Sequence, residues 1–297
     1  MEYVLNGTIA YSILNPTGNI TALAETRVEP ERQPAVAADI MKLHPEVEQV
    51  GFLNLALPDG CDVQAELRMA GGEFCGNAAM CAAAMYFLRN SMESGEDRAV
   101  SAAENREKDR GETGFESDWV PVRIRVSGVT HPVQVRLKAE EKNRFAAGVK
   151  IPSALEIGKR PFTFQSVEGE LPLVSMEGIS HIVIEENSSF FELREKPGEA
   201  EKAVREWCNV LSASCLGLMF LERGTDRDRL TPLVFVPESG TVFWENSCAS
   251  GSSAVGMYLA KKGGVPVEIT LFEPGGSLQV RSDLQTGETW LFGHVSL

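Results

Sequence analysis

The feature that most constrains the fold of this 297-residue chain is a pair of similar segments, one in each half. Each segment runs from a cysteine into an apolar, helix-like stretch. The first contains Cys75 in Glu-Phe-Cys-Gly-Asn-Ala-Ala-Met, and the second contains Cys248 in Glu-Asn-Ser-Cys-Ala-Ser-Gly-Ser-Ser-Ala. Such a spacing indicates duplication of a whole domain, because it is too long for a solenoid repeat. We therefore expect two homologous halves whose helix N-termini, each carrying one cysteine, lie on opposite walls of one cleft.

Local patterns predict the elements around these segments. Turn residues between alternating apolar segments indicate β-hairpins, and apolar residues at helical spacing after a proline indicate helices. Strands are predicted on both sides of the turn at 15–19 and at 50–55, 122–126, 133–137, 171–174, 181–184, 216–221 and 233–236, helices at 30–43 and 197–211, and a hairpin turn at 274–276.

These elements suggest two domains, residues 1–148 with Cys75 and residues 149–297 with Cys248. The segment 90–118 of the first domain differs from the rest in composition. It is rich in Glu, Asp, Arg, Ser and Gly and almost empty of large apolar residues. Such a segment contributes little to a core. We expect it to be a flexible insertion in the first domain.

Composition excludes several classes of function. A formal charge of −14 without a dense Lys/Arg cluster disfavours nucleic acid and anionic membranes as partners. The first residues lack a basic segment followed by an apolar one, and no apolar run is long enough to span a bilayer, so a cytoplasmic location is expected. Six irregularly spaced cysteines indicate free thiols, and four scattered histidines give no metal-ligand spacing.

The two cysteines indicate a specific chemistry. A helix N-terminus presents free N–H groups and partial positive charge, which stabilise a thiolate and also hold a carboxylate. We therefore expect a thiol pKa below the ordinary value of about 8.5 at both positions. With the α-carbon of an amino acid between the two sulfurs, one removes the α-proton and the other delivers a proton from the opposite face. This scheme inverts the centre and requires no pyridoxal cofactor.

Most free cysteines are only small buried hydrophobes. That interpretation is kept for Cys61, Cys81, Cys208 and Cys215. Cys75 and Cys248 differ because Gly, Asn or Ser flank them, which suits close approach of a ligand to the backbone. His181 is left out of the catalytic set.

The cysteine motifs resemble those of the diaminopimelate epimerase-like superfamily of cofactor-independent amino-acid racemases. The closer resemblance is to the histidine racemases of staphylopine-type metallophore biosynthesis, and it extends over residues 15–19, 48–52, 73–78, 244–248 and 274–277. It implies an α+β fold of two pseudo-symmetric domains, each a curved, mostly antiparallel sheet around a central helix. The final strand is able to return to the first domain in such folds.

The same resemblance implies the roles of individual residues. Cys75 and Cys248 are the base and acid pair, and Glu48 matches an acidic position where a carboxylate can accept an imidazole N–H. Glu245 is a candidate partner of the substrate amine. The expected substrate-binding residues are Asn19, Glu48, Gln49, Gly76, Asn77, Glu245, Ala249, Ser250 and Gly251, with no metal and no cofactor.

Two departures bear on the substrate. Diaminopimelate epimerases carry a Glu-Arg pair before the second cysteine, whereas residues 244–247 contain no Arg to hold a distal carboxylate. Ala249 also replaces the usual glycine after the second cysteine. The leading hypothesis is a histidine racemase acting on a small-molecule substrate, with a homodimer compatible with the resemblance. The alternatives are an epimerase of diaminopimelate or another amino acid, and a non-catalytic amino-acid binding protein.

Overall fold

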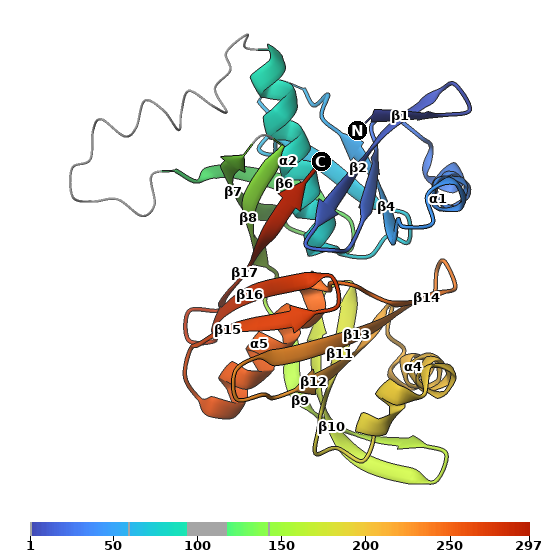
Figure 1. Cartoon of the computed structure of the whole chain (residues 1–297), viewed down its shortest axis with the longest axis vertical. Coiled ribbons are helices and arrows are strands. Elements are labelled where there is room, and N and C mark those ends of the chain that lie inside the picture. The colour runs from blue at the N-terminus through green and yellow to red at the C-terminus, as the bar shows by residue number, and fades with distance from the viewer. Residues whose placement is uncertain (1, 59, 94–117, 142) are drawn as a thin grey trace, which may run out of the picture.

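The computed structural model describes residues 2–58, 60–93, 118–141 and 143–297 (Figure 1). The part of the predicted insertion between residues 94 and 117 lies outside the described residues. Its predicted start at residue 90 is wrong, because helix α2 (Gly76–Glu93) continues to Glu93. An ion pair between Arg89 and Glu25 at 2.8 Å anchors the last turns of this helix.

Within residues 2–58, 60–93 and 118–141 and the strand that follows, the structure describes two α-helices, a short 3-10 helix and eight strands in the first half. They are β1 (Glu2–Leu5), β2 (Ile9–Pro16), β3 (Thr21–Ala24), η1 (Pro30–Arg32), α1 (Gln33–Leu43), β4 (Gln49–Asn54), β5 (Ala65–Met69), α2, β6 (Val120–Val126), β7 (Val133–Glu141) and β8 (Arg144–Ile151). These elements confirm the predicted strands on both sides of the turn at 15–19, the helix predicted at 30–43 and the strands predicted at 122–126 and 133–137.

The second half contains two α-helices, a short 3-10 helix and nine strands. They are β9 (Glu156–Phe164), β10 (Val167–Met176), β11 (Ile179–Glu185), η2 (Phe191–Glu195), α4 (Pro197–Leu211), β12 (Leu216–Glu222), β13 (Asp228–Val236), β14 (Thr241–Trp244), α5 (Ala249–Gly263), β15 (Val267–Glu273), β16 (Gly276–Asp283) and β17 (Glu288–Ser296). The predicted helix from Pro197 and the hairpin turn between β15 and β16 are confirmed.

A closed barrel of eight strands surrounds α2. Its strands pair in the order β2, β3, β4, β5, β6, β7, β8 and β17, and β17 pairs back with β2. The central helix fills the barrel, and its residues from Ala78 to Met85 are at most 3% exposed. Five of these eight residues are alanine, because only small side chains leave room for a helix inside so narrow a sheet.

The second sheet wraps around α5 in the same way. Among its strands, all of which lie in described residues, β9 and β17 do not pair to close it. Its strands pair in the order β9, β10, β11, β12, β13, β15, β16 and β17. Parallel and antiparallel pairs alternate alike in both halves: β3 with β4 and β5 with β6 are parallel, as are β11 with β12 and β13 with β15. The same local signals therefore build two similar sheets.

Strand β17 joins the two halves. Residues 288–292 pair with β16 of the second half, and residues 289–296 pair with β8 of the first. Figure 1 shows the halves as an upper and a lower lobe, with both chain ends in the upper lobe. Strand β17 passes from the lower lobe into the upper one. One cluster of buried side chains extends from the barrel around α2 to the sheet around α5. Helices α1 and α4 cover the outer faces of the upper and lower sheets.

The pairing of the halves brings two helix N-termini together. A Cβ added to Gly76, the first residue of α2, would lie 3.0 Å from the Cβ of Ala249, the first residue of α5. Each of these residues directly follows a cysteine. The prediction that each cysteine precedes a helix is confirmed. Among the described residues, no helix combines the length and the apolar character needed to cross a membrane.

Candidate active site

Both cysteines line one small cavity of about 40 Å³ where the two helix N-termini meet. Nine of the eleven site residues predicted from the sequence lie along its wall: Asn19, Gln49, Cys75, Gly76, Asn77, Glu245, Cys248, Ala249 and Ser250. Sequence reasoning did not select five further lining residues, Glu73, Phe74, Ile179, Val234 and Val236. No lining residue is Lys, Arg or His, so the side chains around the cavity supply negative charge only.

Two predicted residues stand behind the wall. Glu48 is outside the lining but accepts a hydrogen bond from Asn19 Nδ2 at 3.1 Å. Gly251 is packed against the second cysteine, since an added Cβ would lie 3.0 Å from Cys248 Sγ and 2.1 Å from Met219 Sδ. Only glycine fits there without moving one of the two sulfurs.

Cys75 is half-buried and held by two groups of the first half. Its Sγ donates to Gln49 Oε1 at 3.0 Å, and the backbone N–H of Ala78, in the first turn of α2, donates to Sγ at 3.4 Å. Gln49 is oriented in turn, because its Nε2 donates to Thr21 Oγ1 at 2.7 Å. The N-terminus of α2 therefore contacts this sulfur through a backbone N–H group.

Cys248 is buried at 3% exposure and forms the N-cap of α5. Its Sγ lies 3.7 Å from Ser250 Oγ. Its backbone N–H donates to Glu273 Oε2 at 2.6 Å, and Ser252 Oγ donates to the other oxygen of the same carboxyl group. Glu273, the last residue of β15, thus fixes the entrance of the helix from outside the cavity.

The predicted lowering of both thiol pKa values is wrong for this closed cavity. Burial raises the pKa of Cys75 to about 12, and the negative charges of Glu245 and Glu73 add to this rise. Burial likewise raises the pKa of Cys248 well above its usual range, together with Glu245 and Glu273. The N–H groups of Ala78 and Gly251 lower the pKa of Cys75 and of Cys248, respectively, but the effect of burial is larger. A cationic group among these carboxylates would favour the thiolate.

The loop that carries Cys248 is held by both halves of the protein. From the first half, Glu48 accepts bonds from the backbone N–H (3.2 Å) and the side-chain amide of Asn246, and Asn77 Nδ2 donates to the carbonyl of Ser247 at 3.0 Å. From the second half, Gly275 N donates to the Asn246 carbonyl at 2.7 Å. The position of the second sulfur therefore depends on the contact between the halves.

Burial raises the pKa of Glu245 and of Glu273 to about 8. Between the ordinary carboxyl pKa of 4.5 and about 8, the folded protein holds protons that the unfolded chain has released. Stability therefore falls as pH rises through this window. We expect Glu245→Gln to flatten the fall in melting temperature between pH 5 and pH 8, because it removes one of these groups. Thermal unfolding across that range measures it, and the exposed Glu206→Gln should keep the wild-type slope.

Three buried acceptor atoms of cavity residues have no hydrogen-bond partner in the described part of the chain: Asn19 Oδ1, Asn77 Oδ1 and Glu73 Oε2. Buried polar atoms are normally paired, so these atoms indicate where donor groups of a ligand bind. His181 is also completely buried, with both ring nitrogens unpaired and its pKa lowered to about 3 by burial. It does not line the cavity, which agrees with leaving it out of the catalytic set.

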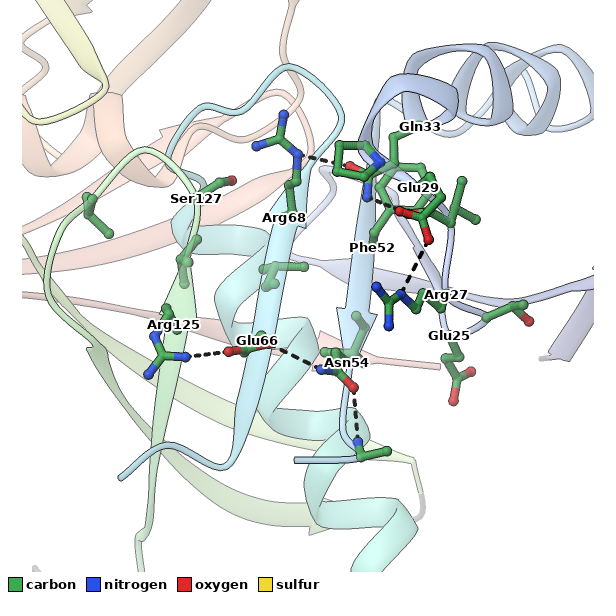
Figure 2. Close-up of a pocket in the computed structure, with 18 residues that line it drawn as sticks. Glu25, Arg27, Glu29, Gln33, Phe52, Asn54, Glu66, Arg68, Arg125 and Ser127 are labelled. Carbon is green, nitrogen blue, oxygen red and sulfur yellow. Dashed lines mark hydrogen bonds and ion pairs between the residues drawn. The ribbon is translucent and has the colours of Figure 1, made fainter. Parts of the chain in front are cut away.

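A larger cavity of about 870 Å³ lies on the first half, between the segment after β3 and strands β4, β5 and β6 (Figure 2). Its charged groups are already paired with protein groups: Arg125 with Glu66, Arg27 with Glu29 at 3.6 Å, and Arg68 with Gln33 at 3.0 Å. It contains no cysteine and none of the predicted site residues. The smaller cavity, with its two thiols and unpaired acceptors, is therefore the candidate active site.

The fold is that of known racemases. A probable proline racemase from Agrobacterium radiobacter superposes with a TM-score of 0.63 at 14% identity, covering 97% of this chain and 90% of that one. The family model described as the histidine racemase CntK N-terminal domain matches residues 8–293. This chain belongs to the histidine racemase family, and it is an isomerase of the racemase and epimerase class.

Two curated relatives illustrate this similarity. A histidine racemase of Fusobacterium nucleatum is 30% identical over 255 residues, which span 84% of this chain and 79% of the relative. A histidine racemase of Staphylococcus aureus is 26% identical over 280 residues, which span 92% of this chain and 88% of the relative. The similarity therefore extends across both halves and both cysteine segments.

Proposed function

We propose that this protein interconverts L- and D-histidine by a two-base mechanism in which Cys75 and Cys248 are the catalytic residues. The observation that carries the proposal is that both thiols line one cavity at two abutting helix N-termini. The names of the curated relatives support histidine as the substrate. The chain's own cavity supports it as well, since two carboxyl groups and no cationic side chain favour a substrate with basic nitrogens.

The reaction needs one thiolate and one thiol. The thiolate forms an S–H bond as the Cα–H bond breaks, and the electron pair moves into the substrate carboxylate. The opposite thiol then gives its proton to the other face of Cα. Backbone N–H groups at Gly76, Asn77, Ala249, Ser250 and Gly251, in the first turns of α2 and α5, would bind the substrate carboxylate and stabilise the extra charge that develops on it. No pyridoxal cofactor takes part in this scheme.

Polar side chains would orient the substrate. Asn19 and Asn77 each offer an unpaired carbonyl oxygen to a donor, and Gln49 holds Cys75. Glu245 would pair with the α-ammonium group, since it lines the cavity and lies within hydrogen-bonding reach of Cys248. Glu48 would act through Asn19 and Asn246, because both its oxygens already hold these residues.

The architecture is part of the same proposal. We infer two diaminopimelate epimerase-like domains, 1–148 and 149–297, related by internal duplication. The repeated alternation of parallel and antiparallel pairs supports this, as does the position of one central helix in each sheet. A homodimer and a cytoplasmic location remain expectations that rest on the resemblance and on the sequence.

The first test is α-hydrogen exchange in deuterium oxide, followed by proton NMR with reduced protein and a panel of L-amino acids. Exchange of L-histidine together with growth of D-histidine is the expected result. Exchange confined to diaminopimelate or another amino acid would keep the cysteine mechanism and replace the substrate. Absence of exchange across the panel would instead favour a binding protein, because simple binding leaves the Cα–H bond intact.

A further inference from the structure

Glu73 enters the cavity two residues before Cys75, yet it plays no part in the mechanism above. The backbone N–H groups of its own residue and of Gly71 lie near its carboxyl group and act to lower its pKa. The backbone carbonyl of Glu73 accepts from Ser127 Oγ at 2.9 Å, which anchors the segment to the residue that directly follows strand β6. Glu73 thus lies in the short connection between β5 and α2, and the backbone of this connection is anchored to the barrel.

One oxygen of this carboxyl group lacks a partner. Glu73 Oε2 is buried and makes no hydrogen bond with any residue that the structure describes. A methyl group added to Gly71 would lie 2.6 Å from this oxygen and 2.8 Å from Val236 Cγ1, which places the oxygen beside the apolar part of the cavity wall. That part is formed by Ile179, Val234 and Val236. Burial raises the pKa of Glu73, and the charge of Arg68 opposes this rise.

An unpaired buried carboxylate oxygen destabilises the folded protein, so a natural protein seldom keeps one without use. The apolar wall and the single acceptor complement a flat ring that presents apolar faces and an N–H edge. By contrast, Glu48 lies outside the wall, and its oxygens are occupied by donors from Asn19 and Asn246.

We propose that Glu73 is the residue that selects the substrate side chain, its Oε2 accepting a hydrogen bond from a ring N–H of an imidazole that lies against Ile179, Val234 and Val236. The inference rests on the proposed function, since it assigns the side-chain contact of the same cavity. Glu73 binds the substrate in this assignment and moves no proton.

The test combines Glu73→Gln with substrates that lack one ring N–H. Wild type and variant are assayed with L-histidine and with its two ring N-methyl isomers, by growth of the opposite enantiomer. We expect Glu73→Gln to lower kcat/KM for L-histidine by about tenfold to a hundredfold, mainly through KM, because a charged hydrogen bond made in both the bound substrate and the transition state is lost. For the isomer methylated at the contacting nitrogen, the kcat/KM of the wild type should already be low, and that of the variant should be only slightly lower.

Glu238→Gln is the matched control, because Glu238 is exposed, acts electrostatically on Glu73 and does not line the cavity. It should stay within about twofold of wild type for all three substrates, the range expected for a surface change. Equal losses for all three substrates in Glu73→Gln would mean a structural role and overturn the inference, as would no loss for any. If the variant does not fold, the wild-type protein alone tests the inference. Equal turnover of histidine and of both methyl isomers by the wild type would overturn it. Wild type that racemises no histidine would instead defeat the proposed function.

Discussion

Cys75→Ser and Cys248→Ser are each expected to lower histidine racemisation by about 10²-fold to 10⁴-fold, the usual contribution of one positioned acid or base. Serine keeps the size of the side chain but is far less acidic than a thiol, so it neither takes nor gives the α-proton at neutral pH. The two sulfurs lie at the entrances of different helices, and neither can replace the other. Racemisation is measured by circular dichroism, starting from each enantiomer.

Exchange in deuterium oxide separates the two roles. Each single variant keeps the thiol that faces one side of Cα, so residual α-hydrogen exchange should survive for one enantiomer only, and for the opposite enantiomer in the other variant. Cys208→Ser is the matched control, because Cys208 is buried in the separate core beneath α4 and donates to the carbonyl of Ala213 at 3.3 Å. Wild-type activity in either serine variant at the cavity would remove that cysteine from the mechanism.

Glu273→Ala is expected to have the largest effect among changes outside the cavity. It leaves the buried backbone N–H of Cys248 and the buried hydroxyl of Ser252 without their common acceptor. Each unpaired buried group costs about 1–3 kcal/mol, so the free energy of unfolding should fall by a similar amount for each. Activity should fall as well, because the backbone of Cys248 loses its anchor from β15. Chemical denaturation and racemisation rates measure the two effects.

Two related variants separate the lost contact from the lost charge. Glu273→Gln keeps a carbonyl oxygen and should retain much of the stability, whereas Ser252→Ala removes only one of the two donors and should cost less than Glu273→Ala. A Glu273→Ala protein with wild-type stability and activity would show that the N-terminus of α5 is held without this carboxyl group.

Much of the fold was accessible from local patterns. The hairpin around the turn at 15–19, the helix from Pro197 and the helices after both cysteines depend on turn residues and on apolar spacing within short segments. The same local patterns predict the start of the insertion wrongly. Residues 90–93 are polar enough to suggest a loop, but they continue a helix whose earlier turns are fixed in the barrel.

Local patterns do not predict the pKa values of the two cavity thiols. A cysteine before a helix suggests a stabilised thiolate, and the bond from Ala78 N–H to Cys75 is present. The sequence does not show that burial and the carboxyl groups of Glu245 and Glu73 outweigh it. Glu273 was missed as well, since residues 273–276 carry only the signal of a hairpin turn, and its contact with Cys248 spans 25 residues.

The sequence by itself determined the positions of the two cysteines at helix entrances and most of the residues that line their cavity. These follow from local conformation and from motifs, which do not depend on distant partners. Only the tertiary structure decided three further features. Glu48 accepts hydrogen bonds from Asn246 in the loop before Cys248, and Glu273 accepts one from the backbone of Cys248. Glu73 has an oxygen without a hydrogen-bond partner among the described residues, beside the apolar wall of the cavity. Burial and hydrogen bonding arise from packing segments far apart in the chain, so they exist only once the two sheets have closed around their helices.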